Sequence, residues 1–368
     1  MFDTDVFVLG GGPSGLAAAI ATRMAGFRVL LADAEQPPIE KACGEGLMPD
    51  SIAAAARLGI NIVPSHGQPF RGIRFQGDTH CVESDFPNGV GVGVRRPVLQ
   101  RLLIDRAQQL GIDFSWGQPV TAVQRETIRL GSNTLRARWI IGADGAQSRV
   151  RRWAGLQQFR RNTLRFGYRR HYRVVAPWSE YMEIHWGNGC QFYVTPVSST
   201  QICVILMSRH SKQRIVEALR LFPMLEKRLQ KCEATGTERG AIAATRQLRR
   251  VTSGNIALIG DASGTVDPIT GEGMCLAFKQ ASALAAALTE GNLALYESAH
   301  ARLSRLPRFM SDFMLLLDTS KTLRTRTLSS FESSPQLFSR LVAMHLGQLH
   351  PTRFFTTAAA LGWRVATA

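Results

Sequence analysis

The sequence predicts an α/β fold with a parallel sheet, an inserted antiparallel sheet and a helical C-terminal region. Three times a short buried strand runs into glycine-rich residues and then a helix, at 5–25, 139–151 and 256–288. Such strand–turn–helix units build parallel sheets. Residues 158–208 alternate between apolar and polar side chains, which predicts antiparallel strands. Residues 292–349 show apolar side chains at helical spacing.

Length and composition are those of a multidomain globular protein. The 368 residues correspond to two or three domains, and 45% of them are hydrophobic. No uninterrupted apolar run approaches the roughly 18 residues of a membrane-spanning helix. Because the first strand begins close to the N-terminus, we expect no cleaved leader and a cytoplasmic location.

The charge balance is strongly basic, with 44 basic and 28 acidic residues, a net charge of +16, and only six lysines. A basic surface attracts nucleic acid, anionic membranes or acidic partners. No helix-turn-helix, zinc-finger or RNA-binding motif accompanies the charge, so we favour solvated arginines and expect no nucleic-acid partner. The six cysteines form no C-x-x-C pair, which argues against a metal site and against a disulfide framework.

The first strand ends in a phosphate-binding pattern. Gly10-Gly11-Gly12-Pro13-Ser14-Gly15 gives G-x-G-x-x-G between a strand and a helix. Gly10 permits the tight turn, Gly12 lets a pyrophosphate approach the backbone, and Gly15 lets the helix pack closely on the strand. The next strand ends at Asp33, 23 residues after Gly10, where a carboxylate suits a ribose hydroxyl. This context predicts a dinucleotide without saying which one.

Two further segments lie where they can contact the same ligand. Lys41-Ala42-Cys43-Gly44-Glu45-Gly46 follows the ribose-binding strand, and its glycines beside charged residues favour a cofactor contact over a simple loop. Arg96 precedes a helix expected over 98–110. An arginine at this place either reaches a pyrophosphate or is simply exposed, and the residues alone leave both interpretations open.

Two later strands also end in turns that expose the backbone. Trp139-Ile140-Ile141 runs into Gly142-Ala143-Asp144-Gly145, and Ser148 is placed to cap the next helix. Residues 256–259 bring Asp261 to the carboxyl end of a strand, ahead of a Pro- and Gly-rich loop and a long apolar helix. Because ligands of α/β sheets bind at the carboxyl ends of strands, one extended ligand can use all three turns.

The middle and the end of the chain differ in pattern. Four strands of a single antiparallel sheet are expected at 166–174, 181–186, 191–197 and 201–207, followed by a surface helix over 214–231. Between 303 and 317 an apolar stripe recurs at helical spacing in a basic region. We expect this stripe to be core or a dimer contact, with docking on a membrane surface as the less favoured alternative.

Together the three glycine motifs resemble the flavoprotein family with the para-hydroxybenzoate hydroxylase fold, over about residues 1–300. The resemblance implies FAD as the tightly held nucleotide. It also implies a Rossmann-like FAD-binding domain, an inserted antiparallel-sheet substrate domain and a helical C-terminal region. We expect these three parts at 1–68, 94–157 and 250–290, at 69–93 and 158–249, and at 291–368, respectively.

The same resemblance implies roles for single residues. Asp33 would hold the adenosine ribose, Arg96 the pyrophosphate and Asp261 the ribityl chain. Pro268, Gly271 and Gly273 would lie at the isoalloxazine ring, where a helix N-terminus supplies positive potential and N–H donors. No protein residue is expected with certainty to be a catalyst. The expected cofactor-binding set is Gly10, Gly12, Pro13, Ser14, Gly15, Asp33, Ala34, Lys41, Cys43, Gly44, Arg96, Gln100, Val120, Asp144, Gly145, Ser148, Gly260, Asp261, Pro268, Gly271, Glu272, Gly273 and Met274.

Within the family, residues 41–46 look most like the geranylgeranyl-reductase branch. The W-x-W-x-I-P motif of flavin-dependent halogenases is missing, and so is their catalytic lysine, because no lysine lies between Lys41 and Lys212. The Y-x-W-x-F-P-like stretch of the reductases has its nearest match in Gln191-Phe192-Tyr193-Val194-Thr195-Pro196, which lacks the tryptophan.

These observations lead us to expect an FAD-dependent monooxygenase of specialised metabolism. It would use NAD(P)H and O₂ to hydroxylate or epoxidise an apolar aromatic, polyketide or isoprenoid-type molecule. The alternatives are a flavin-dependent reductase of isoprenoid or polyketide double bonds and a flavin-carrying binding protein without turnover. Candidate substrate contacts on the sheet are His171, His185, Tyr193 and Thr195, although each is more often a packing or surface residue.

Overall fold

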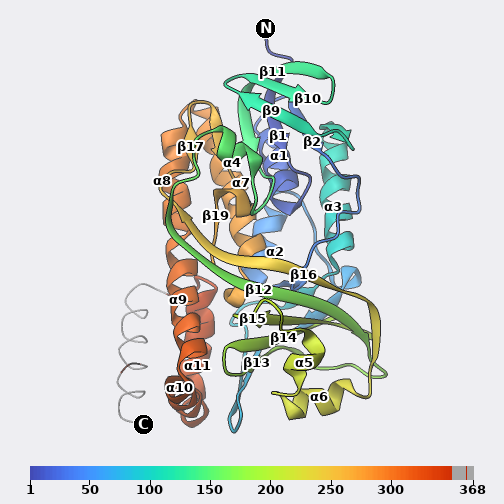
Figure 1. The fold of residues 1–368 in the computed structure, drawn as a ribbon, viewed down its shortest axis with the longest axis vertical. Coiled ribbons are helices and arrows are strands. Elements are labelled where there is room, and N and C mark those ends of the chain that lie inside the picture. Colours follow the sequence, from blue (N-terminus) through green and yellow to red (C-terminus); the bar gives the residue numbers. More distant parts are fainter. Residues whose placement is uncertain (350–361, 363–368) are drawn as a thin grey trace.

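A parallel sheet forms the upper part of the molecule in Figure 1, which shows a computed structural model that describes residues 1–349 and Gly362. Its central strands pair in parallel, with Val8 opposite both Leu31 and Ile141. All three side chains are fully buried, because helices cover both faces of the sheet. The strand order is β17 (Thr252–Ser253), β18 (Ile256–Leu258), β11 (Asn133–Gly142), β1 (Thr4–Leu9), β2 (Val29–Asp33) and β8 (Asp113–Trp116), with β9 (Val120–Gln124) and β10 (Thr127–Leu130) extending β11.

One strand is longer than the sequence predicts. The strand expected at 139–141 is the end of the longer strand β11, whose first half pairs with β10 and whose second half pairs with β1. The helices of this part are α1 (Pro13–Met24), α2 (Pro49–Ala56), α3 (Arg96–Gln109), α4 (Arg149–Trp153) and α7 (Gly273–Thr289). α1, α2 and α3 each carry a proline in the first turn, where its missing N–H costs no hydrogen bond.

The antiparallel sheet crosses beneath the parallel one (Figure 1). All four expected strands are present, as β12 (Phe159–Arg173), β13 (Tyr181–Trp186), β14 (Cys190–Ser198) and β15 (Gln201–Ser208). The sheet is larger than expected, however, because four more strands join it and one of them pairs with β13 in parallel. These are β5 (Gly72–Gln76), β6 (Cys81–Asp85), β16 (Glu233–Leu248) and β19 (Gly264–Thr265).

Smaller elements connect the two sheets. A three-stranded sheet comprises β3 (Gly46–Leu47), β4 (Gln68–Phe70) and β7 (Gly91–Gly93), and short 3₁₀ turns lie at η1 (Pro64–His66), η2 (Gly260–Ser263) and η3 (Pro268–Thr270). The single helix expected over 214–231 is wrong. The chain forms α5 (Ile215–Leu219) and α6 (Pro223–Leu229), because Pro223 starts a new helix and cannot continue the hydrogen bonds of the first.

Four C-terminal helices run along one side of both sheets (Figure 1): α8 (Leu293–Leu303), α9 (Arg305–Thr319), α10 (Lys321–Ser333) and α11 (Pro335–His345). Much of the apolar stripe is core, because Met310, Met314 and Leu317 pack with Ile184 and Ile205 of the antiparallel sheet. Within the described residues, every helix is too short or too polar to cross a membrane. The part of the expected helical region at 350–361 and 363–368 lies outside the described residues.

Candidate active site

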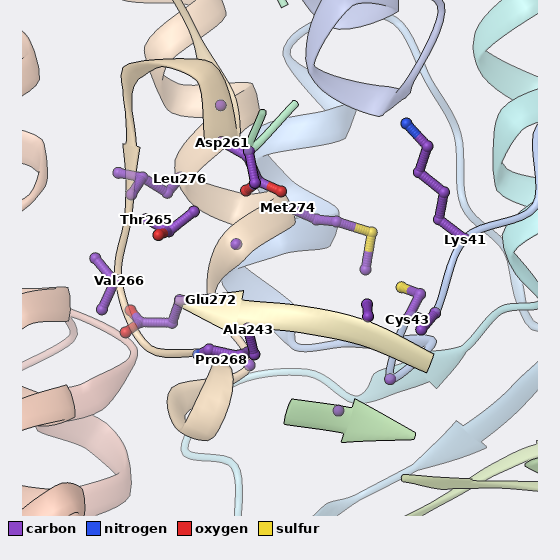
Figure 2. Close-up of a pocket in the computed structure, with 18 of the residues that line it drawn as sticks. Lys41, Cys43, Ala243, Asp261, Thr265, Val266, Pro268, Glu272, Met274 and Leu276 are labelled. Carbon is purple, nitrogen blue, oxygen red and sulfur yellow. The ribbon is translucent and has the colours of Figure 1, made fainter. Parts of the chain in front are cut away.

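A cavity of about 760 Å³ lies between the carboxyl edge of the parallel sheet and the antiparallel sheet. Its polar end is built by the turns that follow four parallel strands. Gly10 follows β1, Asp33 ends β2, Asp144 follows β11 and Asp261 follows β18, and all four line the cavity. Figure 2 shows Asp261 and Met274 on one side of this space, with Lys41 and Cys43 on the other. The three glycine motifs therefore meet at one site.

The first motif opens a path for a ligand to the backbone. Gly10 has φ +120°, and a side chain there would overlap the carbonyl of Ala143. A side chain at Gly15 would overlap the carbonyl of Gly10, so α1 packs directly on the turn. A Cβ at Gly12 would instead meet only Arg96 Nη2, 3.9 Å away, inside the cavity. Gly12 and Arg96 thus face each other across a space that starts at the N-terminus of α1.

Arg96 and Gln100 have different positions although both belong to α3. Arg96 lines the cavity, and its Nε donates to the carbonyl of Ile39 at 3.3 Å. Gln100 lies outside the cavity lining. Its Nε2 donates to the carbonyl of Gly11 at 2.9 Å and its Oε1 accepts the N–H of Ile39 at 2.7 Å. Gln100 therefore ties the glycine turn to the 39–46 loop rather than facing a ligand.

The second turn is fixed to the third by an arginine. Asp144 and Gly145 line the cavity, and Asp144 Oδ2 accepts the N–H of Arg149 at 2.6 Å. Ser148 lies outside the lining and caps α4 by accepting the N–H of Arg151 at 2.9 Å. The Arg151 guanidinium is buried and donates to the carbonyl of Ala262 at 3.1 Å, which holds the two turns together.

The third turn presents backbone to the cavity. Pro268 and residues 271–274 line it, and a Cβ at Gly271 or Gly273 would meet no described protein atom within 4 Å. The loop is held from behind, where buried Asp267 Oδ1 accepts from Arg165 Nη1 at 3.0 Å. Asp261 faces the cavity. Its carboxyl is exposed to the cavity and has no side-chain capping role in the turn.

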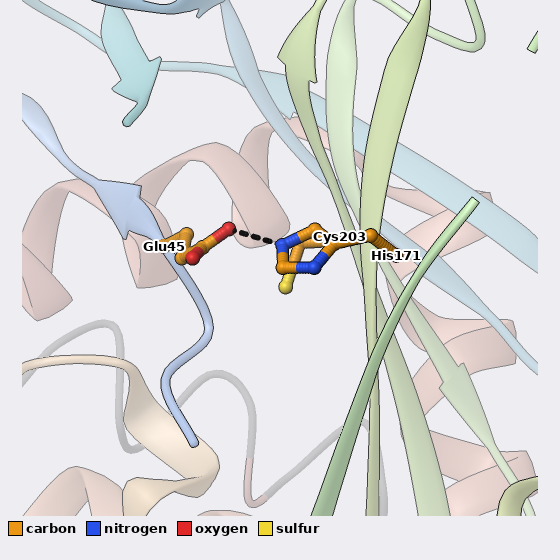
Figure 3. A group of neighbouring side chains, drawn as sticks. All are labelled: Glu45, His171 and Cys203. Carbon is orange, nitrogen blue, oxygen red and sulfur yellow. Dashed lines mark hydrogen bonds and ion pairs between the residues drawn. The ribbon is translucent and has the colours of Figure 1, made fainter. Parts of the chain in front are cut away.

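The 41–46 loop contains a residue that the sequence analysis missed as a site residue, Glu45. Its φ is +59°, a conformation rare for residues other than glycine, and its carboxylate is buried. The carboxylate points at His171 (Figure 3). Oε2 lies 2.7 Å from Nε2 of His171, and Oε1 accepts from Arg169 Nη1 at 3.2 Å. Burial raises the pKa of Glu45. The hydrogen bond from His171, the charge of His171 and the N–H of Arg96 together lower the pKa by more, so the net pKa is below the usual value.

Glu45, His171 and Cys203 place three potential metal-ligand atoms within 4.8 Å of one another. Their chemistry does not suit a cation. The carboxylate already accepts from an arginine side chain and a backbone N–H. Burial raises the pKa of the Cys203 thiol well above its usual range, which disfavours the thiolate that metals bind. We interpret the group as a hydrogen-bonded link between the 41–46 loop and the antiparallel sheet.

The two histidines expected at the substrate need correction. His171 is engaged with Glu45 and lies outside the cavity lining. His185 is on the opposite face of the sheet, because neighbouring residues of a strand alternate, and its Nε2 lies 3.1 Å from Glu183 Oε2. Tyr193 and Thr195 do line the cavity, and Tyr193 Oη donates to the carbonyl of Ile269 at 2.8 Å.

Beyond the third turn the cavity becomes apolar. The sheet supplies one wall and the C-terminal helices supply the other, a contribution the sequence analysis did not anticipate. We name this region the apolar compartment, and its walls are Ile73, Phe75, Met182, Ile184, Ile205 and Met207 on the sheet and Met310, Met314, Phe338, Leu341 and Val342 on α9 and α11. The expected cofactor contacts Ala34, Cys43, Gly44, Val120 and Met274 line the rest of the cavity.

This arrangement defines a class of protein that binds a dinucleotide in extended form beside an apolar chamber. The open backbone at Gly12, Gly271 and Gly273 and the cation at Arg96 fit an FAD molecule laid along the three turns. The chain belongs to the FAD binding domain family, which it matches over residues 3–306. It is an FAD-dependent oxidoreductase.

Known relatives include both reductases and a monooxygenase. The chain is 27% identical to a menaquinone reductase of Mycolicibacterium smegmatis over 80% of its length and 78% of that protein. It is 29% identical to a rifampicin monooxygenase of Rhodococcus hoagii, over 40% of its length and 33% of that protein. A flavoprotein/dehydrogenase structure from Cytophaga hutchinsonii matches with a TM-score of 0.80 and 20% identity, covering 93% of this chain and 92% of that one.

Proposed function

We propose that the protein is an NAD(P)H-using monooxygenase that hydroxylates or epoxidises an apolar small molecule of aromatic, polyketide or isoprenoid type. The observation that carries this proposal is the apolar compartment beside the third turn. Sulfur, aliphatic and aromatic side chains from the sheet and from α9 and α11 enclose it. Such walls select an apolar substrate and keep bulk water from the reacting atoms.

Bound FAD would supply the redox chemistry, namely two-electron reduction by NAD(P)H and activation of O₂. The chain's own residues would bind, orient and shield. Arg96 and the N-terminus of α1 offer charge and N–H donors to phosphates. The N-terminus of α7, at Gly273, would offer positive potential at the other end of the cofactor.

The proposal is tested by oxygen-isotope labelling. Purified holoenzyme is incubated with NADH or NADPH under ¹⁸O₂ and a panel of apolar phenols, polyketides and isoprenoid quinones. We expect at least one compound to stimulate NAD(P)H oxidation and to yield a product with one ¹⁸O atom. A product that gains two hydrogens under anaerobic conditions, with no label under ¹⁸O₂, would exclude monooxygenation.

The walls of the compartment provide a matched pair of variants. Met314→Trp fills the compartment from α9 and should raise KM at least tenfold while FAD content stays constant. Met224→Trp changes a methionine that is 72% exposed on α6 and should leave KM unchanged. Equal KM values for Met314→Trp and wild type would show that the substrate does not bind in the apolar compartment.

Reduction of an isoprenoid or polyketide double bond is the second candidate. It is favoured by the relatives that align over most of the chain, including the menaquinone reductase and a digeranylgeranylglycerophospholipid reductase of Thermoplasma volcanium, 28% identical over 73% of this chain and 74% of that protein. The 41–46 motif, which supplies Lys41 and Cys43 to the cavity, points the same way. The anaerobic arm of the labelling experiment decides between the two reactions.

A further inference from the structure

Two buried ionisable side chains face each other at the cavity wall. Glu272 occupies the N-cap position of α7 without a side-chain capping bond, and His345 is the last residue of α11. Both residues line the cavity, and both are buried: Glu272 is 5% exposed and His345 is 9% exposed. Glu272 Oε2 lies 3.7 Å from His345 Nδ1. Figure 2 shows the Glu272 carboxylate directed away from Lys41 and Cys43.

The hydrogen bonds of His345 determine its tautomer. Nε2 lies 3.0 Å from the carbonyl oxygen of Thr270, which can only accept, so Nε2 carries a hydrogen. In the neutral ring Nδ1 is then an acceptor. Neither Nδ1 nor Glu272 Oε2 has a hydrogen-bond partner among the described protein atoms. Two buried acceptors that face each other at 3.7 Å, beyond hydrogen-bond distance, are unfavourable, and a proton on either atom removes the conflict.

Burial, more than the surrounding charges, favours the protonated form of Glu272. Burial raises the pKa of Glu272, and the charge of Asp50 on α2 raises it further. His345, Lys279 and a bond from Thr270 act in the opposite sense, and the net pKa is raised. Lys279 Nζ lies 3.0 Å from Asp50 Oδ2, and Cys275 Sγ donates to the same oxygen at 2.9 Å. The nearest lysine is therefore already paired with another carboxylate.

We propose that Glu272 and His345 carry one proton, bound to one or the other, and donate it to the reacting atom in the cavity, which is an O₂-derived oxygen in oxygenation and a substrate carbon in reduction. The proposal rests on the proposed function, in which one proton is consumed per turnover. Oxygenation converts R–H, O₂, NAD(P)H and H⁺ into R–OH, NAD(P)⁺ and H₂O. Reduction converts C=C, NAD(P)H and H⁺ into CH–CH and NAD(P)⁺. In both, NAD(P)H supplies the electron pair.

The proton step is the same in both reactions. The O–H bond of Glu272, or the Nδ1–H bond of His345, breaks. The bonding electrons stay on the Glu272 oxygen or on the His345 nitrogen. The proton bonds to the oxygen or carbon that has received electrons, and a proton from solvent then restores the pair. His345 lies beyond the residues 3–306 that match the family, so this wall of the site comes from the C-terminal helices.

The first test measures the proton directly and needs no turnover. Infrared spectra of ¹³C-glutamate-labelled protein at pH 7 should contain a protonated-carboxyl band that disappears in Glu272→Gln. The band should persist in Glu290→Gln, which changes an exposed carboxylate at the other end of α7. In His345→Gln, where the amide can still donate to Thr270 but nothing titrates, the band should shift. A Glu272 carboxylate that is ionised at pH 7 overturns the proposal, whatever the enzyme turns over.

The second test uses the holoenzyme with the substrate found by isotope labelling. Glu272→Gln should lower product formation at least tenfold and abolish the loss of rate at alkaline pH. Because Glu272 also lies in the expected cofactor-binding set, product formation is expressed per bound FAD and compared with the rate of flavin reduction measured in the same variant. Unchanged product formation in Glu272→Gln overturns the proposal. A protonated Glu272 without oxygenated product would contradict the monooxygenase function instead, so the two failures are distinguishable.

Discussion

Glu45 and Arg96 are joined by a hydrogen bond of 3.1 Å from the backbone N–H of Arg96 to Glu45 Oε1. The same carboxylate contacts His171 and Arg169 on the antiparallel sheet. One buried side chain thus links the 41–46 loop, the start of α3 and the antiparallel sheet. The side chain of Arg96 faces the cavity from that start, so Glu45 sets the position of a residue proposed to bind the cofactor.

Glu45→Gln should destabilise the protein and weaken FAD binding together. The substitution leaves the buried Arg169 guanidinium with only its 3.7 Å contact to Glu40 as a charged partner, which costs roughly 3 kcal/mol. Urea unfolding and FAD titration of apoprotein measure the two effects. Glu126→Gln, which breaks an exposed pair with Arg136, is the control and should change neither. If Glu45→Gln binds FAD with wild-type affinity, Glu45 does not position the cofactor site.

Arg96→Ala should weaken FAD binding by about 10- to 100-fold, the value of one or two hydrogen bonds to a charged phosphate. Stability of the apoprotein should change little, since the side chain donates only to the Ile39 carbonyl within the protein. Arg101→Ala alters an exposed arginine on the same helix and serves as the control. Flavin retained through dialysis at the wild-type level would argue against a pyrophosphate contact.

Alanine at Gly12 and at Gly15 should have opposite effects. At Gly12 the new Cβ has room within the protein but enters the ligand space, so apoprotein stability should be kept and FAD affinity lost. At Gly15 the Cβ would overlap the Gly10 carbonyl, so the apoprotein itself should be destabilised. Thermal unfolding of apoprotein and FAD titration distinguish the two, and identical profiles would contradict the assignment.

Glu183 should make the protein acid-sensitive. Burial raises its pKa, but hydrogen bonding and charge from His185, the charge of Arg228 and a bond from Trp178 outweigh it and lower the pKa to about 2. Because the folded pKa lies below the usual 4.5, Glu183 contributes stability above that pH and loses it as pH falls toward 2. The loss is roughly 3 kcal/mol.

The measurement is urea unfolding of wild type and Glu183→Gln between pH 3 and pH 7. The variant should be less stable at pH 7, because Arg228 and Arg74 lose their buried partner. The difference between the two proteins should shrink steadily below pH 4.5. A difference that is independent of pH would mean that Glu183 keeps its ordinary pKa.

Local patterns predicted the elements better than their contacts. Glycine predicted the turn at Gly10, because its effect acts within a few residues. The start of α3 was predicted less well, since the helix begins at Arg96 and not at 98. β16 carried no such signal, since its alanine, glycine and charged residues resemble a loop. Its strand conformation comes from pairing with β12, which begins more than 60 residues earlier.

The sequence by itself determined the family, the cofactor and the three turns, because each motif is a local sequence with its own backbone requirement. Tertiary structure decided which side chains meet. Glu45 reaches His171, and Glu272 reaches His345, only because the sheets and C-terminal helices pack around one cavity. Tertiary structure also places His185 on the face of the antiparallel sheet that lies opposite the cavity. Contacts between distant residues depend on packing between elements, which no short stretch of sequence encodes.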